Sequence, residues 1–74
     1  MGYFAEIDGK VVGSENTLGE LLKKTNIKFL KRDGGARLIR WDTDGYFQNN
    51  VNFSYTFDGY YNNAKCRVKI FFIQ

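Results

Sequence analysis

The chain has 74 residues, of which 43% are hydrophobic and 18% aromatic, and it carries 11 basic against 8 acidic side chains. This length suits one small domain spanning residues 1–74, close to the lower limit for a fold held by its hydrophobic core alone. One cysteine excludes an internal disulfide, and the absence of histidine removes the commonest catalytic base and metal ligand. With no recognisable signal peptide and no apolar run long enough to span a bilayer, we expect a cytoplasmic protein without membrane contact.

The first predicted element is a β-hairpin around Asp8-Gly9. The strand-like runs "YFAEI" and "KVVG" flank this dipeptide. Asp-Gly adopts positive backbone φ at low cost, which tight hairpin turns require. Three further Asp-Gly pairs, at 33–34, 44–45 and 58–59, predict turns along the rest of the chain.

One segment, "SENTLGELLKKTN", has helical spacing. Its three leucines fall on one side of a helix, at Leu18, Leu21 and Leu22. Thr17 followed by Glu20 has the form of a capping box, and the two lysines that follow suit a helix C-terminus. The pattern predicts one short helix over about residues 15–25, whose apolar stripe must be buried against a sheet.

The segment "IKFLKRDGGARLIRW", residues 27–41, predicts a second β-hairpin with a three-residue loop at Asp33-Gly34-Gly35. This register separates a largely apolar face from a largely basic one. It places two pairs of basic residues opposite each other, Lys28 with Arg40 and Lys31 with Arg37. Like charges that face each other across a β-ladder repel, so a bound anion would reduce the repulsion in this hairpin.

The C-terminal part predicts a meander of antiparallel strands. In "VNFSYTF" and "CRVKIFFI" the side chains alternate between two faces with period two. The inner, apolar face comprises Val51, Phe53, Tyr55, Phe57, Cys66, Val68, Ile70 and Phe72. The fold class is therefore α+β: a small two-layer domain with an antiparallel sheet of about five to six short strands and a single helix packed on one face.

No group of residues has the composition of an active site, so we expect a protein that is not an enzyme and that has no catalytic residue, cofactor or metal. Cys66 alternates with inward-facing residues and has no histidine partner, which favours a buried structural thiol. The segment "DTDG", residues 42–45, resembles the start of a calcium loop, but Phe53 occupies the twelfth position, where a glutamate is needed. A turn is the better interpretation of this segment.

Two features predict binding surfaces. The first is a set of basic residues that could bind nucleic acid or another anion: Lys28, Lys31, Arg32, Arg37, Arg40, Arg67 and Lys69. Basic side chains interleaved with aromatics on a sheet suit a nucleic-acid strand. The alternative is a solvated sheet face whose charges discourage aggregation between strand edges.

The second feature is a short internal sequence similarity between "DGYFQNN" at 44–50 and "DGYYNN" at 58–63. Tyrosine, asparagine and glycine on loops are typical of protein-binding surfaces. The predicted protein-binding residues are Tyr60, Tyr61, Asn62 and Asn63, together with Tyr46. The alternative is that one tyrosine of the adjacent pair covers the edge of the core.

These features predict a non-enzymatic binding protein that acts by occupying the surface of a macromolecular partner, either a protein or a nucleoprotein complex. Residue types with A/T-rich codons (Phe, Tyr, Met, Ile, Asn and Lys) make up 32 of the 74 residues, against 15 for Gly, Ala, Arg and Pro. This bias favours an A/T-rich bacterial or mobile-element genome and hence a phage or mobile-element product. From the small size of the protein, and not from a motif, we further expect an inhibitor of a bacterial host defence complex. The alternative function is direct binding of nucleic acid through the basic face of the 27–41 hairpin.

Overall fold

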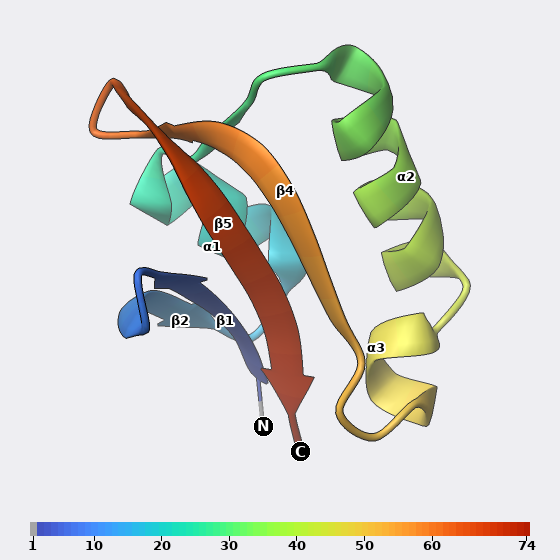
Figure 1. Ribbon diagram of the computed structural model, residues 1–74. Helices are drawn as coiled ribbons and strands as arrows, with labels where there is room; N and C mark the ends of the chain where they lie inside the picture. Colours follow the sequence, from blue (N-terminus) through green and yellow to red (C-terminus); the bar gives the residue numbers. More distant parts are fainter. Residues whose placement is uncertain (1) are drawn as a thin grey trace.

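The computed structural model describes residues 2–74, which form five strands and three helices (Figure 1). In chain order these are β1 (Gly2–Ile7), β2 (Lys10–Glu15), α1 (Leu18–Thr25), β3 (Lys28–Phe29), α2 (Arg32–Thr43), α3 (Tyr46–Asn49), β4 (Ser54–Tyr61) and β5 (Ala64–Ile73). The strands form one sheet in the order β2-β1-β5-β4-β3, and every neighbouring pair is antiparallel. The predicted α+β class with an antiparallel sheet is confirmed.

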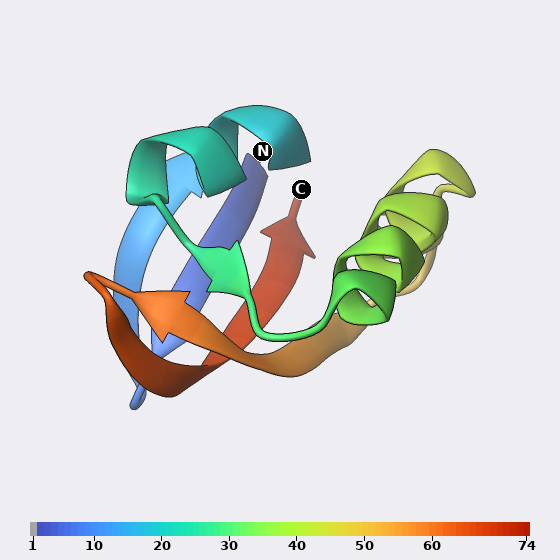
Figure 2. The same ribbon diagram turned by 90° about the horizontal axis from the view of Figure 1, so that it is seen from above.

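The sheet is curved, and the helices lie on its concave side (Figure 2). Helix α1 packs on β1 and β2, α2 begins beside β3, and α3 contacts β5. The core lies between these two layers and consists of Tyr3, Ala5, Leu18, Leu21, Ile27, Leu38, Phe47, Tyr55, Phe57, Val68 and Ile70. Within residues 2–74 no helix lies on the convex face of the sheet, so most side chains there are at least partly exposed to solvent.

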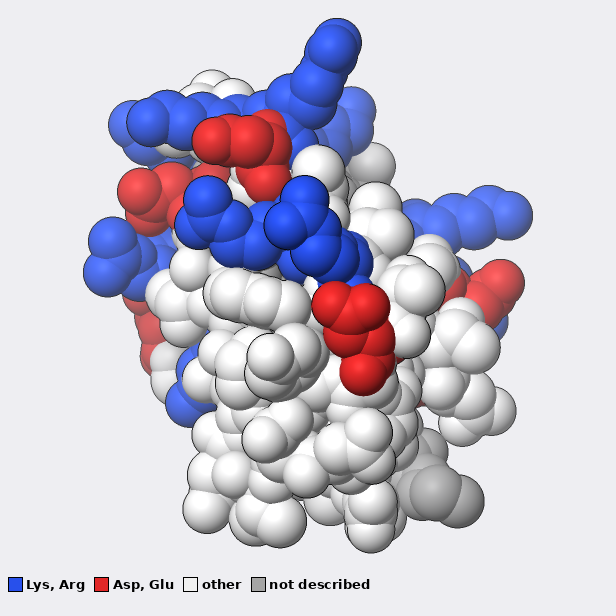
Figure 3. All heavy atoms as spheres, turned by 90° about the vertical axis from the view of Figure 1, so that its right-hand side faces the viewer, with Lys and Arg blue, Asp and Glu red and all other residues white. Residues whose placement is uncertain are grey.

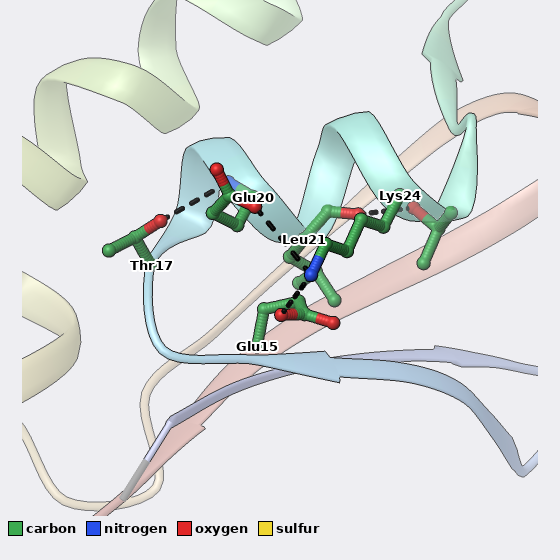
Figure 4. A network of polar contacts seen from close by, with 6 residues as sticks. Glu15, Thr17, Glu20, Leu21 and Lys24 are labelled. Carbon is green, nitrogen blue, oxygen red and sulfur yellow. Dashed lines mark hydrogen bonds and ion pairs between the residues drawn. The ribbon is translucent and has the colours of Figure 1, made fainter.

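Helix α1 forms for the reasons that the sequence indicates. The Thr17 hydroxyl accepts a hydrogen bond from the Glu20 backbone N–H at 3.2 Å, which satisfies one of the free amides of the first turn. Lys24 in the last turn lies 3.3 Å from Glu15 and 3.8 Å from Glu20, and so ties the helix to the end of β2 (Figure 4). Leu21 is fully buried below these contacts.

The turns of the two hairpins both have positive φ at two successive residues. Asp8 and Gly9 join β1 to β2 with φ of 53° and 77°, which confirms the first predicted turn. Asn62 and Asn63 join β4 to β5 with φ of 52° and 64°. The predicted turn at 58–59 is wrong, because both residues lie inside β4.

Gly59 has a different role in β4. A Cβ atom at this position would lie 2.3 Å from the backbone oxygen of Lys28, on the neighbouring strand β3. Glycine is therefore required for the close approach of two backbones and not for a turn. The turn predicted at 44–45 is present, and it joins α2 to α3 through Gly45 at φ 80°.

The predicted 27–41 hairpin is wrong. Only Lys28 and Phe29 are in a strand, and residues 32–43 form α2. Side chains are buried on one side of this helix only, with Leu38 fully enclosed and Trp41 half-buried. This one-sided burial has the 3.6-residue period of a helix that packs on a sheet, and not the two-residue period of a strand.

The predicted inner face of the C-terminal strands is confirmed for most of its residues. Tyr55, Phe57, Val68 and Ile70 are buried, and Phe53, Cys66 and Phe72 are half-buried against them. Val51 is the exception, because β4 begins only at residue 54 and Val51 lies in the preceding loop, where it is 90% exposed.

A polar cluster joins β1 to both C-terminal helices. The Tyr3 hydroxyl donates to Asp42 in α2 and accepts from the Gln48 side-chain amide in α3. Burial, followed by the hydrogen bond and the charge of Asp42, raises the pKa of the Tyr3 phenol above its usual value. Tyr3 therefore stays neutral and holds the helices to the central part of the sheet. None of the helices within residues 2–74 is long and apolar enough to cross a membrane.

Candidate functional site

The predicted tyrosine loop is a strand end and a tight turn. Tyr60 and Tyr61 are the last two residues of β4, and Asn62-Asn63 form the two-residue turn that follows. Neighbouring strand residues point to opposite faces of a sheet. Tyr61 consequently packs against the core, whereas Tyr60 lies on the convex face. The alternative in which one tyrosine covers the core edge is thus the observed one.

Tyr46 lies far from these residues. It is in α3, at the lower right of Figure 1, while the turn of the β4–β5 hairpin is at the upper left. The residue is 43% exposed, and its ring lies 5.7 Å from Phe53 and 6.3 Å from Trp41, measured between ring centroids. The structure does not bring Tyr46 together with the other predicted protein-binding residues.

The predicted basic residues divide into two groups. Arg67 and Lys69 are on the convex face of β5, and each has an acidic partner. The Arg67 Nε atom lies 3.4 Å from Asp58, and the Lys69 Nζ atom lies 3.8 Å from Glu6. These ion pairs leave little net charge on that part of the sheet.

The second group lies on β3 and α2. Its members, Lys28, Lys31, Arg32, Arg37 and Arg40, are all exposed. Among residues 2–74 they have no carboxylate within 4.0 Å. The repulsive cross-strand pairs expected for a hairpin do not exist, because three of these residues are spaced along a helix.

Lys65 was not among the predicted basic residues, although it belongs with the second group. It is exposed at the start of β5, and the register places it opposite Tyr60. Residues 65, 67 and 69 lie on the same face of a strand, so extending the predicted strand by two residues toward the N-terminus would have identified Lys65. We define the basic surface as Lys28, Lys31, Arg32, Arg37, Arg40 and Lys65. On the side of the molecule that α2 occupies, Figure 3 shows Lys and Arg side chains concentrated in the upper half, with several Asp and Glu side chains among them.

The lower half of the same view shows almost no charge (Figure 3). Three large exposed apolar side chains belong to α3, the loop after it and the end of β5, which lie at the bottom of Figure 1: Val51 is 90% exposed, Ile73 52% and Tyr46 43%. We define the uncharged surface as these three residues together with the groove beside them. The groove has a volume of about 560 Å³, and both Val51 and Ile73 line it.

The groove has an apolar floor and an amide-rich rim. Four phenylalanines line it, Phe47, Phe53, Phe71 and Phe72. Its lining also includes the uncharged polar residues Gln48, Asn50, Asn52, Ser54 and Gln74 and the ion pair of Glu6 and Lys69. The Gln48 Oε1 atom is buried here without a hydrogen-bond partner among the described residues. Aromatic area with a rim of uncharged hydrogen-bonding groups is the composition of a protein interface.

A smaller cavity of about 220 Å³ lies between the start of α2 and β4. Phe29 and Phe57 form its apolar wall, and its charged lining is balanced, with Lys31 and Arg37 against Asp33 and Asp58. The lining carries charges of both signs, and Asp58 is paired with Arg67, so we assign no separate site to this cavity.

Comparison of the chain with protein-family models, with curated proteins and with solved structures gives no match.

Proposed function

We propose that this protein is a non-enzymatic binding protein that occupies a surface of a partner protein, and that the uncharged surface makes the contact. The observation that supports this most is the exposure of Val51 and Ile73 in the lining of one groove, with the exposed Tyr46 packed on Phe53 of that lining. Clustered exposed apolar side chains with a polar rim are typical of protein-binding sites on small soluble domains. Val51 packs on nothing in the core, so its apolar character is not explained by folding.

The groove gives such a contact a defined anchor point. Its volume of about 560 Å³ is in the range of concave sites that hold one or two large side chains or a small ligand. An apolar or aromatic side chain of the partner would contact the phenylalanine floor, and the amides of the rim would bond to the partner's backbone. A few such desolvated contacts usually dominate the free energy of binding at an interface.

This proposal replaces the predicted protein-binding loop at residues 60–63 and keeps Tyr46 from the predicted set. We retain the sequence-based interpretation of the partner as a host defence complex, with this chain as its phage or mobile-element inhibitor. The A/T-biased composition supports only the phage or mobile-element origin. The apolar groove supports only the protein-binding part.

The test is co-purification from the native host with the tagged protein, followed by identification of bound species by mass. Val51→Asn removes exposed apolar area, and Val11→Asn is the matched control because Val11 is 51% exposed on β2. We expect a partner that the unchanged protein and Val11→Asn retain, and that Val51→Asn binds at least about tenfold more weakly, a loss of about 1.4 kcal/mol. A partner that all three proteins bind equally would place the interface elsewhere.

A further inference from the structure

Three side chains form a row across three strands on the convex face of the sheet. The register pairs Lys28 of β3 with Tyr60 of β4, and Tyr60 with Lys65 of β5. Directly paired residues of antiparallel strands have side chains on the same face, with Cβ atoms about 5 Å apart. The Tyr60 ring is therefore flanked on both sides by lysines.

Both lysines of this row carry uncompensated charge. Neither has a carboxylate within 4.0 Å in the part of the chain that the structure describes. The nearest carboxylate on the same face of β4 belongs to Asp58, two residues from Tyr60, and it is paired with Arg67. Lys31 and Arg32, which follow β3 and begin α2, extend the positive charge beyond the row.

We infer that the row Lys28–Tyr60–Lys65 binds single-stranded nucleic acid, with a base on the Tyr60 ring and backbone phosphates at the two lysines. A partly exposed aromatic ring between cations matches the alternation of base and phosphate along a single strand. A duplex would leave the ring unused, because its bases already stack on one another. No helix of the described residues lies on the convex face, so a nucleic-acid strand can reach the ring without a change of fold (Figure 2).

An acidic protein segment is the competing occupant of a basic surface. Such a segment would pair with the lysines but would gain little from the aromatic ring between them. The position of Tyr60 between two unpaired lysines therefore favours nucleic acid. Recognition of this kind is tolerant of sequence, because every base has a flat face on which an aromatic ring can stack.

The test measures fluorescence anisotropy of a labelled single-stranded 12-mer at several salt concentrations, with the duplex of the same sequence and polyglutamate as competitors. Tyr60→Ala should weaken oligonucleotide binding by about 5- to 150-fold, since stacking on one aromatic side chain contributes about 1–3 kcal/mol. Tyr60→Phe should keep the affinity of the unchanged protein, because the ring remains. Lys28→Gln and Lys65→Gln should each reduce the slope of log affinity against log salt by about 0.7.

Lys10→Gln is the matched control, because Lys10 is also exposed and unpaired among residues 2–74 but lies on β2. It should change the slope far less than Lys28→Gln. Circular dichroism of every variant separates lost binding from lost folding. The inference would be overturned if the protein did not bind the oligonucleotide at low salt, or if Lys10→Gln and Lys28→Gln changed the slope equally. It would also be overturned if polyglutamate competed as well as the single strand and Tyr60→Ala had no effect on binding. None of these outcomes bears on the uncharged surface, which is tested through Val51.

Discussion

The Tyr55 hydroxyl donates a hydrogen bond to the Gly34 carbonyl oxygen at 3.0 Å, and this contact joins β4 to the first turn of α2. The helix can approach the sheet closely there because Gly35 has no side chain. A Cβ atom on Gly35 would lie 3.0 Å from the Phe29 ring, which itself packs on Phe57 with ring centroids 4.5 Å apart. The position of α2 thus depends on a small residue at 35.

Replacing the two neighbouring glycines of α2 by alanine should change the stability of the fold in opposite directions. At Gly34 an added Cβ meets only the Tyr55 hydroxyl at 3.7 Å, an ordinary contact, so Gly34→Ala should stabilise the fold by about 0.4–1 kcal/mol. Gly35→Ala should destabilise it by about 1–2 kcal/mol, because the pinned Phe29 ring must move. Urea denaturation measures both changes, and a stabilised Gly35→Ala variant would show that the Phe29 ring moves freely.

The leucines of α1 should differ in their contribution to stability. Leu21 is fully buried, and Leu21→Ala should cost about 2–5 kcal/mol, enough to unfold much of a small domain. Leu22 is only half-buried, so Leu22→Ala should cost about half as much or less. Thermal unfolding followed by circular dichroism compares the two variants, and equal losses would contradict the observed orientation of α1.

The adjacent tyrosines at the end of β4 should also differ in their contribution to stability. Tyr61 packs against the core, so Tyr61→Ala should cost roughly 1–3 kcal/mol of stability. Tyr60 lies on the convex face, and Tyr60→Ala should change stability by less than about 1 kcal/mol. Denaturant midpoints of the two variants check this difference. The reverse order of stabilities would mean that β4 is paired one residue out of register.

Stability should fall at alkaline pH because of Tyr3. Its pKa is raised in the folded state, mainly by burial, while an unfolded tyrosine titrates near about 10. Below that pH the phenol is protonated in both states and its contribution is constant. Above it the unfolded chain loses the proton first, so the free energy of unfolding decreases as the pH rises.

The measurement is the melting temperature between about pH 8 and 11 for the unchanged protein and for Tyr3→Phe. Tyr3→Phe should be less stable at neutral pH, because it leaves Asp42 and Gln48 without their shared partner. It should also show a shallower alkaline decline. Parallel curves for the two proteins would assign the decline to other groups, such as the lysines.

Much of the fold follows from local features of the sequence. Positive φ at Asp8-Gly9, the Thr17 cap of α1 and the two-residue period of β4 and β5 each depend on neighbouring residues only, so they were predicted correctly. The uncharged character of residues 46–54 is equally visible in the sequence. The sequence does not show that this segment forms an exposed surface, because the exposure of Val51 depends on where β4 begins.

Tertiary contacts decided the rest. Gly34-Gly35 favours a turn when only local propensity is considered, yet the pair lies in α2 because burial of Leu38 and close packing on Phe29 outweigh that propensity. Asp58-Gly59 and Asn62-Asn63 are both suited to a hairpin turn, and the pairing of β4 with β5 selects the second. The row of Lys28, Tyr60 and Lys65 arises from that same register. Residues 28, 60 and 65 become neighbours only when three strands pair, so no local pattern in the sequence could have shown them together.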